Sequence, residues 1–248
     1  MKIIGLIPSR LSSVRLPGKA LLDICGLPMV IHTYKRALFA KALTEVYICT
    51  DSLDIKRVCE HFNVPCIMTS RSHSNGTERI AEAASSFSGV DYFIDIQGDE
   101  PLINPEHIDS VANFHQENAH DIILPHILTN DTNENIVKIV DTNGKVIYLT
   151  RASCPHPFRS EVQYKKHLSI ISFTPDALKK YAGMKESPLE CIEGVELIRA
   201  IENNLSIGTF ELSGDSFSVD VGQDYANAIS AMKKDKLFNN TKYVLDSK

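Results

Sequence analysis

The chain lacks a long apolar segment: no run in its 248 residues approaches the ~18 apolar residues that a membrane-spanning helix needs. The short apolar stretch that follows Met1 and Lys2 is also too short for the apolar part of a secretory signal peptide. We therefore expect no membrane partner and a cytoplasmic location.

An excess of positive charge is also missing, since the formal net charge is −5. Broad binding to nucleic acid or to anionic membranes depends on a basic surface that neutralises phosphates. The composition therefore excludes nucleic acid as the main partner, and any cluster of cations has a local role.

None of the six cysteines belongs to a C-x-x-C pair, and several lie in apolar runs such as residues 46–49. Soft-metal sites need clustered cysteine and histidine ligands, so we expect buried free thiols in a reducing compartment. Linkers, internal repeats and low-complexity segments are absent as well. We expect one domain over residues 1–248.

The first half of the chain alternates short apolar runs with segments of helical periodicity. Strands are expected at residues 3–7, 46–49, 64–68 and 92–96, and helices from Pro28, at 53–62 and at 77–84. Repeated β-α units of this kind predict a mostly parallel sheet covered by helices.

The second half has a less regular order. After a helix that ends near residue 117, we expect a strand at 122–126, a helix at 190–203 with an Asn-Asn C-cap, a strand at 207–212 and a last helix from Tyr225. Asn143-Gly144 separates two alternating runs, which is a strong hairpin signal. We predict an α/β fold with an inserted antiparallel subregion.

The loop after the first strand contains three cations, Arg10, Arg15 and Lys19, together with Ser12 and Ser13. Ligands of open α/β sheets bind at the carboxyl ends of the strands, and arginine, lysine and hydroxyl donors suit phosphate. The spacing does not match the Walker A motif. A solvated basic loop is the alternative to a polyanion site.

A second polar loop, residues 97–101, follows the strand at 92–96 and should face the same edge of the sheet. Gly98 permits close backbone approach, and Asp99 would place a carboxylate beside bound phosphates. Mg²⁺ would join the two, because it takes one or two protein carboxylates and completes its shell with phosphate oxygens and water. A turn that caps the next helix is the alternative.

Asp220 is a second candidate metal ligand, while Asp224 is better placed to cap the last helix. The loop at 73–79, with Gly76 inside it, has the composition either to hold a base or sugar or to form a plain turn.

On the later half, Arg151 could pair with a carboxylate and His167 could contact an acidic sugar, although a histidine on a strand is more often structural. Glu193, Glu196 and Arg199 recur at helical spacing, which a solvated, ion-paired face would show equally.

Seven segments together resemble the 3-deoxy-manno-octulosonate cytidylyltransferase (CMP-Kdo synthetase) family, in the same order and over nearly the whole chain. They are residues 7–19, 75–79, 97–101, 150–152, 166–168, 187–190 and 219–220. The resemblance implies a Rossmann-like nucleotidyltransferase of the nucleotide-diphospho-sugar transferase fold, usually a homodimer, that converts CTP and Kdo to CMP-Kdo and pyrophosphate for lipopolysaccharide or capsule.

The resemblance also implies residue roles. Lys19, Arg10 and Asp99 are the expected catalytic residues, and Asp99 and Asp220 the expected Mg²⁺ ligands. The expected nucleotide-binding set is Arg10, Ser12, Ser13, Lys19, Asn75, Gly76, Arg79 and Gln97. The expected sugar-acid-binding set is Gln97, Arg151, His167, Glu193 and Glu196. A sugar-binding and dimerisation subregion is expected at about residues 130–215.

Departures from the family pattern lie mostly on the expected sugar side, at residues 169–173, at Leu197 and at Val221-Gly222, with Asn75 as a further one. Three alternatives stay open: a cytidylyltransferase for an amino-substituted or nine-carbon ulosonic acid, a sugar-1-phosphate nucleotidyltransferase, and a nucleotide-binding relative without turnover.

Overall fold

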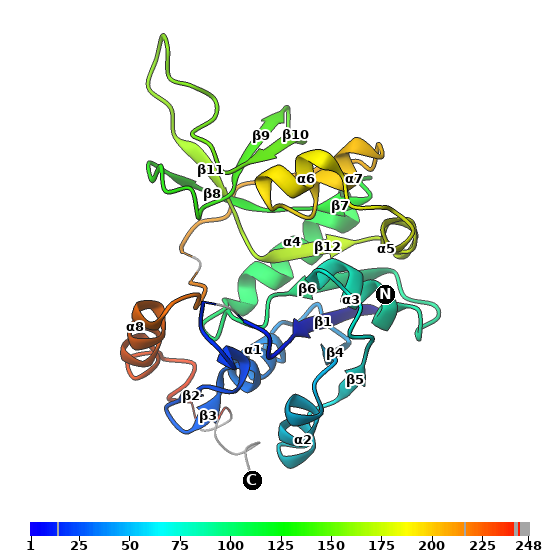
Figure 1. Cartoon of the computed structure of the whole chain (residues 1–248), viewed down its shortest axis with the longest axis vertical. Coiled ribbons are helices and arrows are strands. Elements are labelled where there is room, and N and C mark those ends of the chain that lie inside the picture. The colour runs from blue at the N-terminus through cyan, green and yellow to red at the C-terminus, as the bar shows by residue number, and fades with distance from the viewer. Residues whose placement is uncertain (14, 216, 241–242, 244–248) are drawn as a thin grey trace.

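The computed structural model describes residues 1–13, 15–215, 217–240 and 243 (Figure 1). Its largest element is an 11-stranded sheet with the strand order β5-β4-β1-β6-β12-β7-β13-β10-β9-β11-β8. A two-stranded ribbon of β2 (Asp23–Ile24) and β3 (Leu27–Pro28) stands apart from it.

The four strands from the first half of the chain form the parallel part of the sheet. Strand β1 (Ile3–Ser9) pairs with both β4 (Glu45–Thr50) and β6 (Tyr92–Ile96), and β5 (Cys66–Met68) extends it beyond β4. The expected β-α order of this half is confirmed. Parallel pairing also brings the ends of β1 and β6 to the same edge, so the two polar loops that follow them lie side by side.

The second half is mostly antiparallel. Strand β12 (Ile170–Phe173) runs against β6 and β7 (Ile122–Ile123), and β13 (Ile207–Gly208) runs parallel to β7. The remaining strands pair antiparallel with their neighbours: β10 (Lys145–Thr150), β9 (Lys138–Thr142), β11 (Tyr164–His167) and β8 (His126–Thr129).

The predicted hairpin at Asn143-Gly144 is confirmed, because both residues have positive φ, 50° and 78°, and β9 and β10 pair across them. The single-domain assignment with a sugar-binding subregion at about 130–215 stays a prediction.

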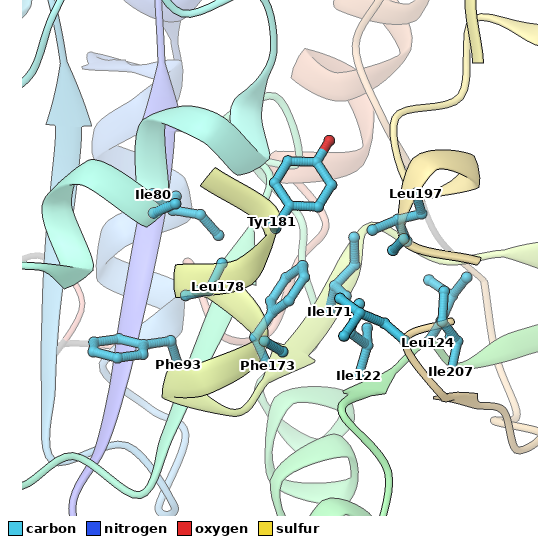
Figure 2. Packing of buried hydrophobic residues seen from close by; sticks show 14 of the residues in the cluster. Ile80, Phe93, Ile122, Leu124, Ile171, Phe173, Leu178, Tyr181, Leu197 and Ile207 are labelled. Carbon is cyan, nitrogen blue, oxygen red and sulfur yellow. The ribbon is translucent and has the colours of Figure 1, made fainter. Parts of the chain in front are cut away.

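Helices cover both faces of the sheet. One apolar cluster contains side chains of α1 (Met29–Ala37), α2 (Leu53–His61) and α4 (Pro105–Glu117). The cluster on the other face contains α3 (Gly76–Ala84), α5 (Pro175–Ala182) and α7 (Ile198–Glu202). Figure 2 shows Ile80, Leu178 and Tyr181 of these helices with Phe93 and Phe173 of the sheet. A third cluster joins α8 (Gly222–Met232) to the β2–β3 ribbon.

Three expected elements were wrong in extent. The strand at 122–126 divides into β7 and β8, with Pro125, which has no N–H to donate, between them. The helix at 190–203 divides into α6 (Pro188–Glu193) and α7, because Gly194 adopts a left-handed conformation with φ 62°. The strand at 207–212 pairs as a strand only at β13, followed by an isolated bridge at Glu211.

The helix ends follow expectation more closely. Asn203 is the C-cap of α7 and Asn204 has φ 62°, as the Asn-Asn pair predicted. The last helix, α8, begins at Gly222 and not at Tyr225 as expected. Asp224 still caps it, but from within the first turn, where it accepts hydrogen bonds from the backbone N–H groups of Asp220 and Val221 at 3.0 Å. Within the described residues, no helix combines the length and the apolar character needed to cross a bilayer. All six cysteines are free, as expected, but the expectation of burial holds only for Cys49 and Cys59: Cys25, Cys66 and Cys154 are half-buried and Cys191 is exposed.

Candidate active site

Two adjoining cavities lie at the carboxyl edge of the parallel strands. The first, about 380 Å³, is formed by the loops after β1 and β6 and by the start of α3. It is lined by Arg10, Ser12, Ser13, Lys19, Asn75, Gly76, Arg79, Gln97, Asp99 and Asp220, among others. Every residue of the expected nucleotide and metal sets therefore lines one cavity.

The second cavity, about 750 Å³, opens toward the antiparallel strands and α6. Arg151, His167 and Glu196 of the expected sugar-acid set line it, and Gln97 lines both cavities. The two also share Arg15, Asn75, Asp99 and Asp220. A ligand in one cavity therefore meets a ligand in the other across Gln97 and the two aspartates.

The first cavity has the charge pattern of a polyanion site. Four of its lining residues, Arg10, Arg15, Lys19 and Arg79, are cations, and two, Asp99 and Asp220, are anions. Arg10 is exposed in the loop after β1, and Ser12 and Ser13 follow it. Guanidinium and ammonium groups around a mostly polar cavity suit phosphate oxygens.

Lys19 lies at the centre of this site. Gly18 adopts a left-handed conformation with φ 67°, and Lys19 opens the 3₁₀ helix η1 (Lys19–Leu21) directly after it. Its Nζ donates to Asp99 Oδ2 at 2.6 Å, to Asp220 Oδ1 at 3.1 Å and to the Val219 carbonyl at 3.2 Å. Burial by itself lowers the pKa of Lys19, but the two carboxylates outweigh it and hold the pKa above its usual value.

Backbone contacts bring the two aspartates together. A Cβ on Gly98 would lie 2.9 Å from the carbonyl oxygen of Pro8, so only glycine allows the loop after β6 to approach the end of β1 this closely. The Val219 N–H donates to the Asp99 carbonyl at 2.9 Å, which fixes the segment before α8 beside the β6 loop. Asp99 and Asp220 thus converge on one ammonium group.

This convergence fits a divalent cation. Both carboxylates contact Lys19 Nζ, so their oxygens face a point that already holds positive charge. Among the described residues, no group of three or more His, Cys, Asp or Glu side chains is arranged to hold a metal ion. Mg²⁺ does not need one, because substrate phosphates and water complete its shell around one or two carboxylates.

Helix α3 begins at the border of the cavities. Asn75 is its N-cap and accepts a hydrogen bond from the Glu78 N–H at 2.8 Å. A Cβ added at Gly76 would meet the Pro8 side chain at 3.4 Å. Arg79 is buried, donates to Thr69 Oγ1 at 2.6 Å and lies 3.3 Å from an Asp51 carboxylate oxygen. Arg79 therefore holds the strand β5 end and the β4 end at the cavity wall.

Two side chains that line the second cavity, His167 and Glu196, have shifted pKa values. Burial lowers the pKa of His167 to about 4, which keeps the ring neutral at pH 7. Burial raises the pKa of Glu196, whose Oε2 lies 3.5 Å from the Thr77 backbone N–H at the start of α3.

Arg151 and Glu193 are engaged by the protein itself. The guanidinium of Arg151 donates to the carbonyls of Glu134, Asn135, Glu193 and Gly194. The Glu193 carboxylate accepts from Tyr148, Thr150 and the Arg151 N–H, and the side chain does not line either cavity. The structure therefore separates Glu193 from the other four residues of the expected sugar-acid set, and its binding role stays a prediction.

Glu193, Glu196 and Arg199 do not form one solvated face, because the helix breaks at Gly194. Arg199 is 1% exposed and makes two hydrogen bonds to Glu190, at 2.5 and 2.6 Å, and one to Glu78 at 2.9 Å. This buried network joins α3 to α6 and α7 and so fixes the two cavities relative to each other.

The sequence analysis left two site residues without a role. Arg15 lines both cavities and lies 3.0 Å from Asp220 Oδ1. Asp95, on β6, is fully buried and accepts a hydrogen bond from Gln97 Nε2 at 2.9 Å. In the sequence, Asp95 is the one charged residue of the apolar run at 92–96, and this could have marked it as a buried carboxylate near the site.

Comparisons with known proteins agree with this geometry. A family model described as Cytidylyltransferase matches residues 4–207. A 3-deoxy-manno-octulosonate cytidylyltransferase of Leptospira interrogans is 38% identical over 95% of this chain and 98% of its own length. One of Fusobacterium nucleatum is 37% identical over 96% and 99%. The chain belongs to the 3-deoxy-manno-octulosonate cytidylyltransferase family.

Solved structures of nucleotidyltransferases have the same fold as this chain. A CMP:2-keto-3-deoxy-manno-octonic acid synthetase complexed with CTP superposes with a TM-score of 0.88 at 30% identity, over 94% of this chain and 99% of that one. A putative glucose-1-phosphate thymidylyltransferase from Bacillus anthracis has a TM-score of 0.73 at 15% identity, over 98% of this chain and 99% of that one, which shows the shared fold alone. The nucleotidyltransferase fold and the family expected from the seven ordered segments are both confirmed.

Proposed function

We propose that this cytidylyltransferase joins CTP and 3-deoxy-manno-octulosonate to give CMP-Kdo and pyrophosphate. The observation that supports it best is the pair of adjoining cavities that meet at Gln97, Asp99 and Asp220. The first is rich in cations suited to phosphates, and the second combines cations such as Arg151 and Lys166 with acidic and neutral groups. CTP in the first cavity would present its α-phosphate to a sugar acid in the second.

The reaction forms a bond between the anomeric oxygen of the sugar acid and the α-phosphorus, and breaks the bond from the α-phosphorus to the oxygen that leaves with pyrophosphate. Binding the two substrates in adjoining cavities orients this in-line attack. Lys19, with Arg10 and Arg15 nearby, neutralises charge on the phosphates as pyrophosphate departs.

Asp99 and Asp220 are the residues that would hold Mg²⁺. When bound, Mg²⁺ supplies charge neutralisation at the phosphates. The Lys19 ammonium group occupies the point on which both aspartates converge, so with Mg²⁺ held there Lys19 would contact the phosphates in place of the carboxylates.

The test is pyrophosphate release, measured for several nucleoside triphosphates crossed with several sugar acids and one sugar 1-phosphate. CTP with Kdo should give the highest kcat/KM. Turnover that is faster with another ulosonic acid, or only with the sugar 1-phosphate, would replace Kdo as the acceptor.

Asp99→Asn should lower Mg²⁺-dependent pyrophosphate release by about 10²-fold or more, as loss of a group that stabilises developing charge does. Asp141→Asn is the matched control, because Asp141 also pairs with a lysine, Lys165, at 2.5 Å and lines neither cavity. A fully active Asp99→Asn variant would remove Asp99 from the metal role.

We further propose that the protein works as a homodimer through its antiparallel part, and that it works in the cytoplasm. Of the ten exposed large hydrophobic residues in the part of the chain that the structure describes, five lie between residues 128 and 192: Leu128, Ile147, Phe158, Leu189 and Ile192. This part projects at the top of Figure 1. Six free thiols support a reducing compartment.

Light scattering after gel filtration should give twice the chain mass. Phe158→Ser combined with Ile147→Ser should shift the protein toward monomer, while Leu53→Ser, at a leucine on α2 about as exposed as Ile147, should not. A wild-type monomer at micromolar concentration would refute the dimer.

A further inference from the structure

A buried carboxylate lies directly under the junction of the two cavities. Asp95 is 0% exposed on β6, opposite Leu6 of β1 and Ile171 of β12, and lines neither cavity. Its Oδ2 accepts from Gln97 Nε2 at 2.9 Å, while its Oδ1 has no hydrogen-bond partner among the described atoms. Burying a carboxylate with one partner is costly, so a neutral residue would be the more stable choice at this position.

The neighbouring charges make the position more costly still. Burial raises the pKa of Asp95 well above its usual value, and the carboxylates of Glu196 and Asp99 raise it further. Packing therefore gives no reason for a carboxylate here. The hydrogen bond to Gln97 does give one.

In its ionised form, which the hydrogen bond from Gln97 favours, Asp95 only accepts hydrogen bonds, whereas a side-chain amide has one donating and one accepting end. Gln97 must therefore turn its Nε2 toward Asp95. The other end, the carbonyl oxygen Oε1, is then left for ligands at the junction, because Gln97 lines both cavities. An asparagine at residue 95 would accept or donate equally and would leave both orientations of Gln97 open.

We propose that Asp95 is a positioning residue that fixes the Gln97 amide with its carbonyl oxygen toward the acceptor. At this point the site then selects a hydrogen-bond donor, which in a sugar acid is a hydroxyl group, and disfavours the carboxylate of the acceptor. This inference deepens the proposed function and rests on it for the identity of the acceptor.

A double-mutant cycle tests the proposal through the KM for Kdo. Gln97→Leu and Asp95→Leu should each raise that KM by up to about 10-fold, the effect of losing one hydrogen bond between neutral groups, with a smaller change in the KM for CTP. If Asp95 acts through Gln97, Asp95→Leu adds nothing when Gln97 is already leucine. Effects that multiply in the double variant would overturn the proposal.

Asp95→Asn keeps the size of the side chain, so it tests the positioning role of Asp95 if Asp95→Leu does not fold. It should raise the KM for Kdo about 2-fold, because half of the Gln97 amides would face the wrong way. An unchanged KM would count against the role.

A readout without turnover separates this inference from the proposed function. The side-chain ¹H–¹⁵N signals of Gln97, assigned by their loss in Gln97→Leu, should be shifted and protected from exchange in the wild type and revert toward free glutamine in Asp95→Leu. Gln97 signals that are the same in the wild type and in Asp95→Leu would refute the positioning role even in a fully active enzyme. An enzyme inactive on Kdo whose signals do respond would refute only the proposed acceptor.

Discussion

Replacing Lys19 with methionine should change two measured quantities in opposite directions. The substitution keeps the length of the side chain and removes the charge that contacts Asp99 and Asp220 at 2.6 and 3.1 Å. Without nucleotide, the two carboxylates then have no ammonium group between them. They should bind Mg²⁺ more tightly, while turnover should fall because the triphosphate loses a cation.

The magnitude follows from the charges. A divalent ion about 4 Å from an ammonium group is repelled by roughly 2 kcal/mol at the dielectric constant of water. The three side chains are only 17%, 24% and 34% exposed, so the water value does not overstate the repulsion, although salt reduces it. Removing it should tighten Mg²⁺ binding about 5- to 30-fold. Pyrophosphate release should fall by about 10²- to 10³-fold, as for other groups that stabilise developing charge.

Calorimetric titration with MgCl₂ measures the first effect, and pyrophosphate release from CTP and Kdo measures the second. Lys165→Met is the matched control, because it removes a lysine from another aspartate pair, with Asp141, outside both cavities. It should change neither quantity. Weaker or unchanged Mg²⁺ binding in Lys19→Met would refute joint binding by the two aspartates, and wild-type turnover would refute the role of Lys19.

Three further predictions concern stability. Arg199→Met leaves the buried Glu190 carboxylate without its partner and should cost about 3–5 kcal/mol in urea unfolding, and a loss below 1 kcal/mol would contradict the network. Burial lowers the pKa of His32 to about 4, so between pH 6.5 and 4 the unfolded state binds more protons than the folded state. The free energy of unfolding should therefore drop by up to about 3 kcal/mol as the pH falls from 6.5 to 4. His32→Gln should flatten this dependence, and an equally steep dependence in the variant would assign it to other groups. Gly98→Ala places a Cβ 2.9 Å from the Pro8 carbonyl oxygen, so it should lower the free energy of unfolding by about 1–3 kcal/mol and reduce turnover. A variant with wild-type stability and turnover would show that the loop after β6 can move away from β1.

How far the sequence predicts the fold depends on how local the signals are. The β-α alternation of residues 3–96 follows from hydrophobic periodicity and capping residues such as Ser52, whose side chain accepts from two N–H groups at the start of α2. The region after residue 120 is less predictable. Strand pairing there joins segments far apart in sequence, and breaks depend on single residues such as Pro125 and Gly194.

The candidate site divides in the same way. Arg10, Lys19 and Asp99 of the first cavity lie in loops that follow parallel strands, so strand order alone brings them to one edge of the sheet. On the acceptor side, a side chain's availability depends on which neighbours it meets. Arg151 donates to four backbone carbonyls and Glu193 accepts from three donors, and neither fact is visible in the residue types.

The sequence by itself therefore determined the family, the parallel half of the sheet and the set of charged residues available to a triphosphate, because these follow from ordered motifs and local periodicity. Only the tertiary structure decided which charges meet. Asp99 and Asp220 converge on Lys19 because a backbone hydrogen bond joins Val219 to Asp99. Asp95 lies beneath Gln97 because β6 is covered on both faces, and the long-range packing that covers it is absent from any single stretch of the chain.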